Sequence, residues 1–251
     1  MDTGVRRAAF AAGALVVSTA AWTVILGRGL TVGVTGASIV LIAVSLWVSA
    51  VVSVTGILVA RARWARRLGL VTSGGHGIVA LLAPVDVWWG VAAVLTAVTA
   101  VAIAGPWLDG VVRGRPSASG PPARVVLIAL GFLWVPFAIG VAGGDGWPAV
   151  SIGLSALAAA YWFIRALPGA LLVVRVVWPL LAVALAVPLG FPAGIVAAAY
   201  GVAIGAIAWH SSVRTSLHPL VESGTRVPIP PELAPKEVLD AADIDDRGRP
   251  R

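Results

Sequence analysis

The chain has 251 residues, of which 59% are hydrophobic and 12% are charged, and its mean hydropathy is +0.96. A soluble domain carries about 25% charged residues, so this composition excludes an ordinary soluble protein. The net charge of +7 does not indicate a nucleic-acid-binding protein, because the basic residues lie mainly in short segments between apolar runs. The sequence has no cysteine, which excludes disulfides, iron–sulfur clusters and thiolate metal sites, and we expect no cofactor.

Apolar runs long enough to cross a bilayer core of about 30 Å recur along residues 1–210. They are continuous rather than alternating, so we predict an all-α polytopic helical bundle and not a barrel. The eight predicted spans are residues 8–26, 37–60, 68–84, 87–107, 125–141, 149–163, 169–189 and 193–209. Residues 8–26 also fit a secretory signal, but seven further apolar segments favour an uncleaved first span. The halves 1–107 and 125–209 each hold four spans, which fits a tandem repeat without residue-level similarity to establish it.

The basic loops set the predicted orientation. Arg61, Arg63, Arg66 and Arg67 form one cluster before the third span, and residues 109–124 form a second basic loop. Both loops belong on the cytoplasmic side, so the third and fourth segments must both cross the membrane. We therefore predict a multi-pass protein of the plasma membrane with both termini in the cytoplasm. The four clustered arginines are predicted to contact lipid head groups.

Small residues form seams on two predicted spans. Ser38, Ser45, Ser49 and Ser53 recur along one face of residues 37–60. We interpret this face as a packing surface, with a pore-lining stripe as the alternative. A second seam on residues 193–209 consists of Gly194, Ala198, Gly201 and Gly205. It fits close packing either inside the bundle or between protomers of an oligomer.

Tryptophan supports the predicted spans, because it is enriched where helices leave the membrane. Outer ends carry Trp22, Trp88, Trp89 and Trp147, and inner ends carry Trp64, Trp107, Trp162 and Trp209. Trp134 and Trp178 lie deeper, close to Pro136 and Pro179. Prolines kink helices, so these two spans either pack in the bundle or frame a cavity.

His76 is the one ionisable residue at the centre of a predicted span, within Gly74-Gly75-His76-Gly77. Ionisable groups at that depth are candidate functional groups. The alternative is a structural hydrogen bond from a serine seam such as that of residues 37–60. His210 and His218 lie at or beyond the inner end of the last span, far from His76 in depth, so we predict no metal site.

Arg175 lies inside the seventh predicted span, near its inner end. Its long stem can carry the guanidinium to the inner interface, which is the structural interpretation. The functional alternative is a fixed positive charge that faces an anionic solute.

Residues 211–251 differ in composition from the bundle and form the predicted cytoplasmic tail. Residues 228–235 are rich in proline and favour an extended, polyproline-like conformation. Residues 236–244 read as a short helix with Val238, Leu239 and Ala242 on one face. A helix this short is marginally stable in water. It therefore either packs on a surface, or the segment is a disordered tether. Residues 225–251 are the predicted contact for a protein partner.

Two functions follow from these features. The first is a non-enzymatic membrane component that assembles with or recruits a partner through its tail. The alternative is a transporter for a small neutral or anionic solute, with His76 and Arg175 beside its path. An intramembrane enzyme is a third class, for which the sequence offers no convincing catalytic group.

Overall fold

The computed structural model describes residues 3–29, 36–59, 61–109, 123–211 and 213. Within these ranges the secondary structure is helical and contains no strand, so the predicted all-α helical bundle is confirmed. The loop at 110–122 and nearly all of the tail, including the helix expected at 236–244, lie outside the described residues.

The helices follow the predicted order. They are α1 (Thr3–Gly27), α2 (Gly36–Leu58), α3 (Arg63–Leu82), α4 (Val87–Ala104), the 3₁₀ turn η1 (Pro106–Leu108), α5 (Ala123–Val141), α6 (Gly146–Ile164), α7 (Ala170–Leu172), the π-helical turn η2 (Val173–Val177), α8 (Trp178–Leu189) and α9 (Ala193–Ala208). α7, η2 and α8 form one continuous rod. The π turn lies just before Pro179, which has no N–H to continue a regular α-helical ladder.

Six of the helices in the described ranges are long and apolar enough to cross a membrane, by length and composition. They are α1, α2, α4, α5, α6 and the rod Ala170–Leu189. The two other predicted spans correspond to α3 and α9. α3 has 20 residues but begins with a cluster of arginines, and α9 is a shorter apolar helix of 16 residues.

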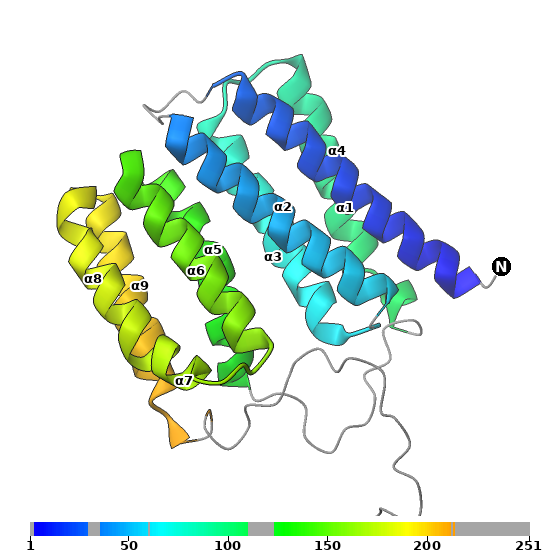
Figure 1. The fold of residues 1–251 in the computed structure, drawn as a ribbon. Coiled ribbons are helices and arrows are strands. Elements are labelled where there is room, and N and C mark those ends of the chain that lie inside the picture. The colour runs from blue at the N-terminus through cyan, green and yellow to red at the C-terminus, as the bar shows by residue number, and fades with distance from the viewer. Residues whose placement is uncertain (1–2, 30–35, 60, 110–122, 212, 214–251) are drawn as a thin grey trace, which may run out of the picture. The chain divides into compact units, whose positions relative to one another are not determined.

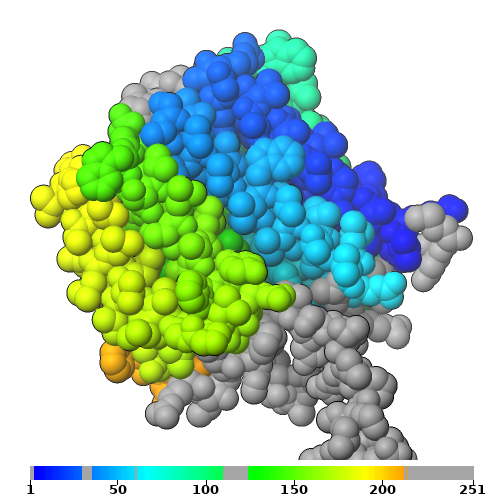
Figure 2. Space-filling model, in the orientation of Figure 1, coloured from blue at the N-terminus to red at the C-terminus, as the bar shows by residue number. Residues whose placement is uncertain are grey.

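The helices pack in two groups of four, which meet where α2 lies against α5 (Figure 1). α1 to α4 form the first group, and α5, α6, the rod and α9 form the second. Trp22 and Leu46 belong to a core of the first group, whereas Phe132, Phe163 and Trp178 fill the core of the second. The space-filling view shows the first group, blue to cyan, in direct contact with the second, green to yellow (Figure 2).

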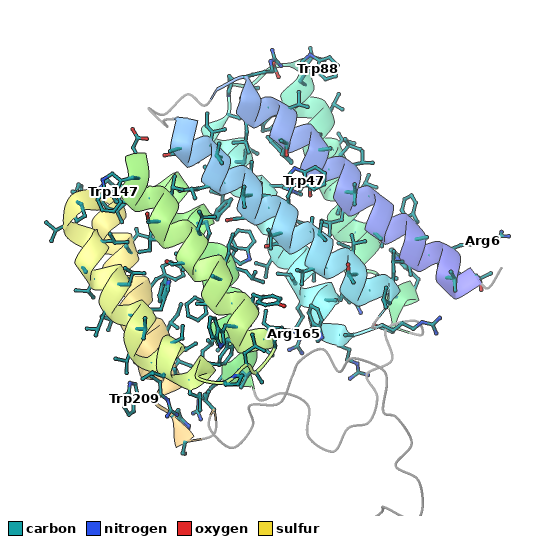
Figure 3. All side chains as sticks on the ribbon, viewed as in Figure 1. Arg6, Trp47, Trp88, Trp147, Arg165 and Trp209 are labelled. Atoms are coloured by element: carbon teal, nitrogen blue, oxygen red, sulfur yellow. The ribbon has the colours of Figure 1, made fainter. Side chains whose placement is uncertain are left out.

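Neighbouring helices alternate in direction, so arginines gather at one end of the bundle. For example, the start of α2 lies beside the end of α5, because Ser38 of α2 donates a hydrogen bond of 2.6 Å to the carbonyl of Gly144, just after α5. Figure 3 shows Arg6 and Arg165 at one end and Trp88 and Trp147 at the other. We call the first end the basic end. It holds Arg6, Arg7, Arg61, Arg63, Arg66, Arg67, Arg124, Arg165 and Arg175.

Each group of four uses an arginine from its third helix to cap its fourth. In the first group Arg66 of α3 donates from Nε to the carbonyl of Ile103 at 2.7 Å, near the end of α4. In the second group Arg175 donates from Nε to the carbonyl of Ala208 at 2.8 Å, at the end of α9. Carbonyls at a helix C-terminus lack partners within the helix, and a cation there also suits the helix dipole. This shared device supports the tandem arrangement of the two halves.

The small-residue seam of α9 faces α8 within the same chain. A Cβ added to Gly201 would lie 2.9 Å from Cβ of Ala182, and one added to Gly205 would lie 3.2 Å from Cγ of Pro179. Gly194 is closer still to the backbone of Ala186. These glycines therefore serve a helix contact inside the bundle.

Candidate functional site

His76 lies on the inward face of α3 and is fully buried. The glycines around it have different surroundings. A Cβ on Gly75 would lie 2.4 Å from Cη2 of Trp134, so this glycine admits the indole ring of α5. Gly74 and Gly77 have open space where a Cβ would be. One glycine of the three thus allows another helix to approach closely, next to the histidine and not over its ring.

Both ring nitrogens of His76 meet hydroxyl groups of α1. Ser18 Oγ lies 3.2 Å from Nδ1, and Thr19 Oγ1 lies 3.2 Å from Nε2. Ser18 and Thr19 are themselves fully buried. A neutral imidazole has one donor nitrogen and one acceptor, and a hydroxyl can serve either. Each ring nitrogen therefore has a hydroxyl of α1 within hydrogen-bond distance.

The hydroxyl of Thr96 sets the direction of these hydrogen bonds. Thr96 of α4 donates to the carbonyl of Ala92 at 2.9 Å, and its oxygen lies 3.1 Å from Ser18 Oγ. Ser18 consequently donates to Thr96, and the Ser18 oxygen accepts from the N–H at Nδ1 of His76. Nε2 is then an acceptor that competes with the closer carbonyl of Leu15, at 2.8 Å, for the single hydroxyl proton of Thr19.

Indole groups extend the polar cluster. Trp22 of α1 donates from Nε1 to Thr96 Oγ1 at 2.7 Å, and Trp47 of α2 donates from Nε1 to Thr23 Oγ1 at 2.9 Å. The hydroxyl of Thr99 on α4 lies 2.9 Å from the carbonyl of Ala14 on α1 and 2.7 Å from the carbonyl of Leu95, so its proton is shared between them. His76 thus joins α3 to α1, Thr96 and Thr99 join α4 to α1, and Trp47 joins α2 to α1.

The hydrogen-bond partners of His76 come from α1, and not from the serine seam of α2 that the sequence offered as an example. The serines of α2 are all buried, but Ser38 bonds to Gly144 and Ser53 donates to the carbonyl of Ala65 at 2.8 Å. Ser45 Oγ and Ser49 Oγ are buried without a hydrogen-bond partner in the described part of the chain. The missed signal was in residues 8–26, where Ser18 and Trp22, and Thr19 and Thr23, are each four residues apart on one helix face.

Trp22 also departs from its predicted place. We expected it at the outer interface, but its side chain is buried and its indole N–H points to Thr96. By contrast, Trp88, Trp147 and Trp209 are exposed, as interfacial residues would be. The deeper tryptophans are packed: Trp178 meets Phe132 edge-on with ring centroids 4.8 Å apart, and Trp134 meets Phe137 at 4.7 Å.

Arg175 is half-buried at the basic end. In addition to its hydrogen bond to Ala208, its guanidinium carbon lies 5.2 Å from the ring centroid of Trp209. An arginine over an indole face is a favourable cation–π pair. Its charge is therefore directed to the end of α9.

The four arginines of the 61–67 cluster have different environments. Arg66 bonds to Asp109 and to carbonyls at the end of α4, so its guanidinium is held by the protein. Arg61, Arg63 and Arg67 are exposed at the basic end. These three remain available to lipid head groups.

The opposite end carries one ion pair that joins α1 to α4. Arg28 and Asp86 are 2.7 Å apart, and Asp86 also accepts from the backbone N–H of Trp89 at 2.8 Å as the N-cap of α4. That backbone hydrogen bond, together with the charge of Arg28, lowers the pKa of the Asp86 carboxyl below its usual value.

No group of three or more His, Cys, Asp or Glu side chains within the described ranges is arranged to hold a metal ion. Comparisons with protein-family models, with curated proteins and with solved structures found no match.

Proposed function

We propose that this chain is a multi-pass protein of the plasma membrane that recruits a protein partner through residues 225–251 and performs no catalysis itself. One observation carries this proposal. His76 and Arg175, the polar groups singled out inside apolar segments, direct their hydrogen bonds to neighbouring helices of the same chain. Groups used in this way stabilise a bundle, which then serves to anchor the tail.

The basic end supports the proposed orientation. Arginines in short connections favour the cytoplasmic side of a membrane, and nine of the described arginines belong to this end. At the other end, Arg28 is paired with Asp86, and Asp145 is the N-cap of α6. In this orientation α3 and α9 also cross, which gives eight spans with both termini in the cytoplasm.

The proposal that the tail contacts the partner rests on the sequence of the tail. Val238, Leu239 and Ala242 share one face of the short helix expected at 236–244. That face is too small to fold alone and gains stability by packing on a partner. The proline-rich residues 228–235 would hold it away from the membrane surface.

Truncation tests the proposal. Cells expressing the full chain or a chain ending at residue 224 are chemically crosslinked, and the proteins bound to each are quantified by mass spectrometry. We expect the truncated chain to reach the membrane in equal amount and to lose its specific partner. The double substitution Val238→Ser with Leu239→Ser should have the same effect. Asp240→Asn with Asp243→Asn, a matched change off the apolar face, should not. An unchanged set of bound proteins after truncation would refute the proposal.

The polar cluster around His76 favours transport of a small neutral or anionic solute as the second candidate. Hydroxyls and an imidazole inside apolar helices can exchange their mutual hydrogen bonds for bonds to a polar solute if α1 separates from α3 and α4. Solute uptake by vesicles containing the purified protein separates the two candidates. Loss of uptake in His76→Ala, with the bundle still folded, would favour transport. If His76→Ala left solute uptake unchanged, the result would favour the anchoring function.

A further inference from the structure

An open groove runs between α1 and α4 near the basic end. It has a volume of about 430 Å³ and an entirely apolar lining. Its lining residues are Phe10, Ala97, Val98, Val101, Ala102 and Trp107. Val101 and Phe10 are largely exposed, at 61% each, so the groove opens outward from the helices.

Trp107 forms a fixed wall at the basic end of this groove. Its indole Nε1 donates a hydrogen bond of 2.9 Å to the carbonyl of Ala102, so the polar edge of the ring points towards the backbone of α4. Gly105 allows this arrangement, because any Cβ at that position would collide with the Trp107 ring. Arg66 secures the same turn by bonding to Asp109 and to the carbonyl of Ala104. The groove is therefore a built feature with a carbon-only surface.

Positive charge lies beyond the same end of the groove. Arg6 and Arg7 precede Phe10 by four and three residues on α1, so all three lie on adjoining parts of one helix face. Side chains on a helix lean towards its N-terminus, so both guanidinium groups extend away from the groove to the basic end. Both arginines are exposed, and no ion pair joins either of them to an acid in the described ranges.

We propose that this groove and Arg6-Arg7 form a binding site for one anionic phospholipid. One acyl chain lies along the groove between Phe10 and Trp107, and the phosphate contacts Arg6 and Arg7. Charge complementarity identifies this occupant, because an apolar protein segment offers no anion and a zwitterionic lipid balances its phosphate with a cation of its own. The inference rests on the proposed membrane insertion but not on the proposed tail partner.

A photoactivatable lipid tests the site. The purified full chain is reconstituted in vesicles of phosphatidylcholine with a small fraction of either phosphatidylglycerol or phosphatidylcholine that carries a diazirine on its acyl chain. Labelled peptides are mapped by mass spectrometry. We expect the phosphatidylglycerol probe to label the peptides around Phe10 and Val101 well above the level of the phosphatidylcholine probe. Each arginine near an anionic lipid contributes a factor of about five in binding, so Arg6→Gln with Arg7→Gln should remove most of this difference.

Three further substitutions complete the design. Ala97→Leu fills the groove from an exposed helix position and should reduce labelling by both probes, whereas Ala199→Leu, an exposed apolar position on α9, should not. Arg165→Gln removes an exposed arginine from the same end and should leave labelling unchanged. Equal labelling by the two probes, or no effect of the Arg6/Arg7 pair, would overturn the proposal. Flotation of the protein with the vesicles reports insertion separately, and a chain ending at residue 224 should label normally.

Discussion

At the residue scale, the hydroxyls of Ser18 and Thr19 each lie 3.2 Å from one nitrogen of the buried His76 imidazole. Ser18→Ala removes the hydroxyl 3.2 Å from Nδ1 of His76, and Thr19→Val removes the hydroxyl 3.2 Å from Nε2. A buried polar group left without a partner costs about 1–3 kcal/mol, and hydrogen bonds between membrane helices average about 0.6 kcal/mol. We expect each substitution to lower the free energy of unfolding by about 1 kcal/mol. Unfolding in mixed micelles with increasing denaturing detergent measures this.

The serines of α2 supply the matched control. Ser45 and Ser49 are as deeply buried as Ser18, but their hydroxyls have no partner in the described residues. Replacing either by alanine removes no hydrogen bond and should leave stability unchanged or slightly raised. If Ser45→Ala cost as much as Ser18→Ala, the hydrogen bonds to His76 would not be the cause of the loss.

Gly75 and Gly74 provide a second prediction at the same scale. A Cβ on Gly75 would lie 2.4 Å from Cη2 of Trp134 and 3.0 Å from Cδ2 of Leu46, so Gly75→Ala forces α3 and α5 apart. Such overpacking costs about 1–3 kcal/mol. Gly74→Ala meets open space and favours the helix, so it should be neutral or stabilising. Thermal unfolding in detergent compares the two, and equal effects would contradict the close approach of Trp134.

At the element scale, two arginines hold the ends of α4 and α9. Arg66→Gln removes the guanidinium that bonds to Ile103 and Asp109, so the turn at Gly105–Asp109 should open more often. A loss of about 1 kcal/mol corresponds to about a fivefold faster amide exchange there, read by hydrogen–deuterium exchange. Arg63→Gln, an exposed arginine on the same helix, should leave exchange unchanged. Faster exchange in both variants would indicate a general effect of lost charge.

The N-terminus of α4 depends on pH through Asp86. Its pKa is lowered in the folded protein, first by the Trp89 N–H and then by Arg28, so its contribution to stability is present above the usual carboxyl pKa of about 3.8. That contribution is lost as the pH falls below this value and through the lowered pKa. Asp86→Asn keeps a good N-cap but removes the charge. We expect the variant to melt at a lower temperature than the natural chain at pH 6 and to converge with it near pH 2. A constant difference across this range would rule out the charge as the cause.

The order of the helices could be predicted from the sequence because turn signals interrupt the apolar runs. Some starts could not: α1 begins at Thr3 and not at residue 8, and α3 begins at Arg63, so most of the cluster expected in a loop is helical. Pro84-Val85-Asp86 and Gly143-Gly144-Asp145 lie between helices as expected. The rotation of each helix about its axis could not be predicted. α1, for example, is apolar on most sides, so its sequence does not show which face turns inward. For this reason Trp22 was placed at the interface, and the two hydroxyls that meet His76 were overlooked.

At the scale of the whole molecule, the two four-helix groups were suggested by the spacing of the spans but not by residue similarity. The groups share a device instead: an arginine of the third helix bonds to the end of the fourth. Arg66 and Arg175 appeared in the sequence only as a loop residue and an intramembrane charge. Their common task depends on contacts between helices, and those follow from packing in three dimensions.

The orientation of the bundle in the membrane gives the last prediction. The natural chain has no cysteine, so single cysteines report their own positions without background. Val85→Cys and Phe191→Cys lie in exposed turns at the end opposite the basic end, and Arg63→Cys and Arg165→Cys lie at the basic end. A membrane-impermeant thiol reagent should label the first pair on intact cells and the second pair only after permeabilisation, because basic ends favour the cytoplasm. The reverse pattern would place both termini outside, and labelling of Val85 and Phe191 on different sides would show that fewer than eight segments cross.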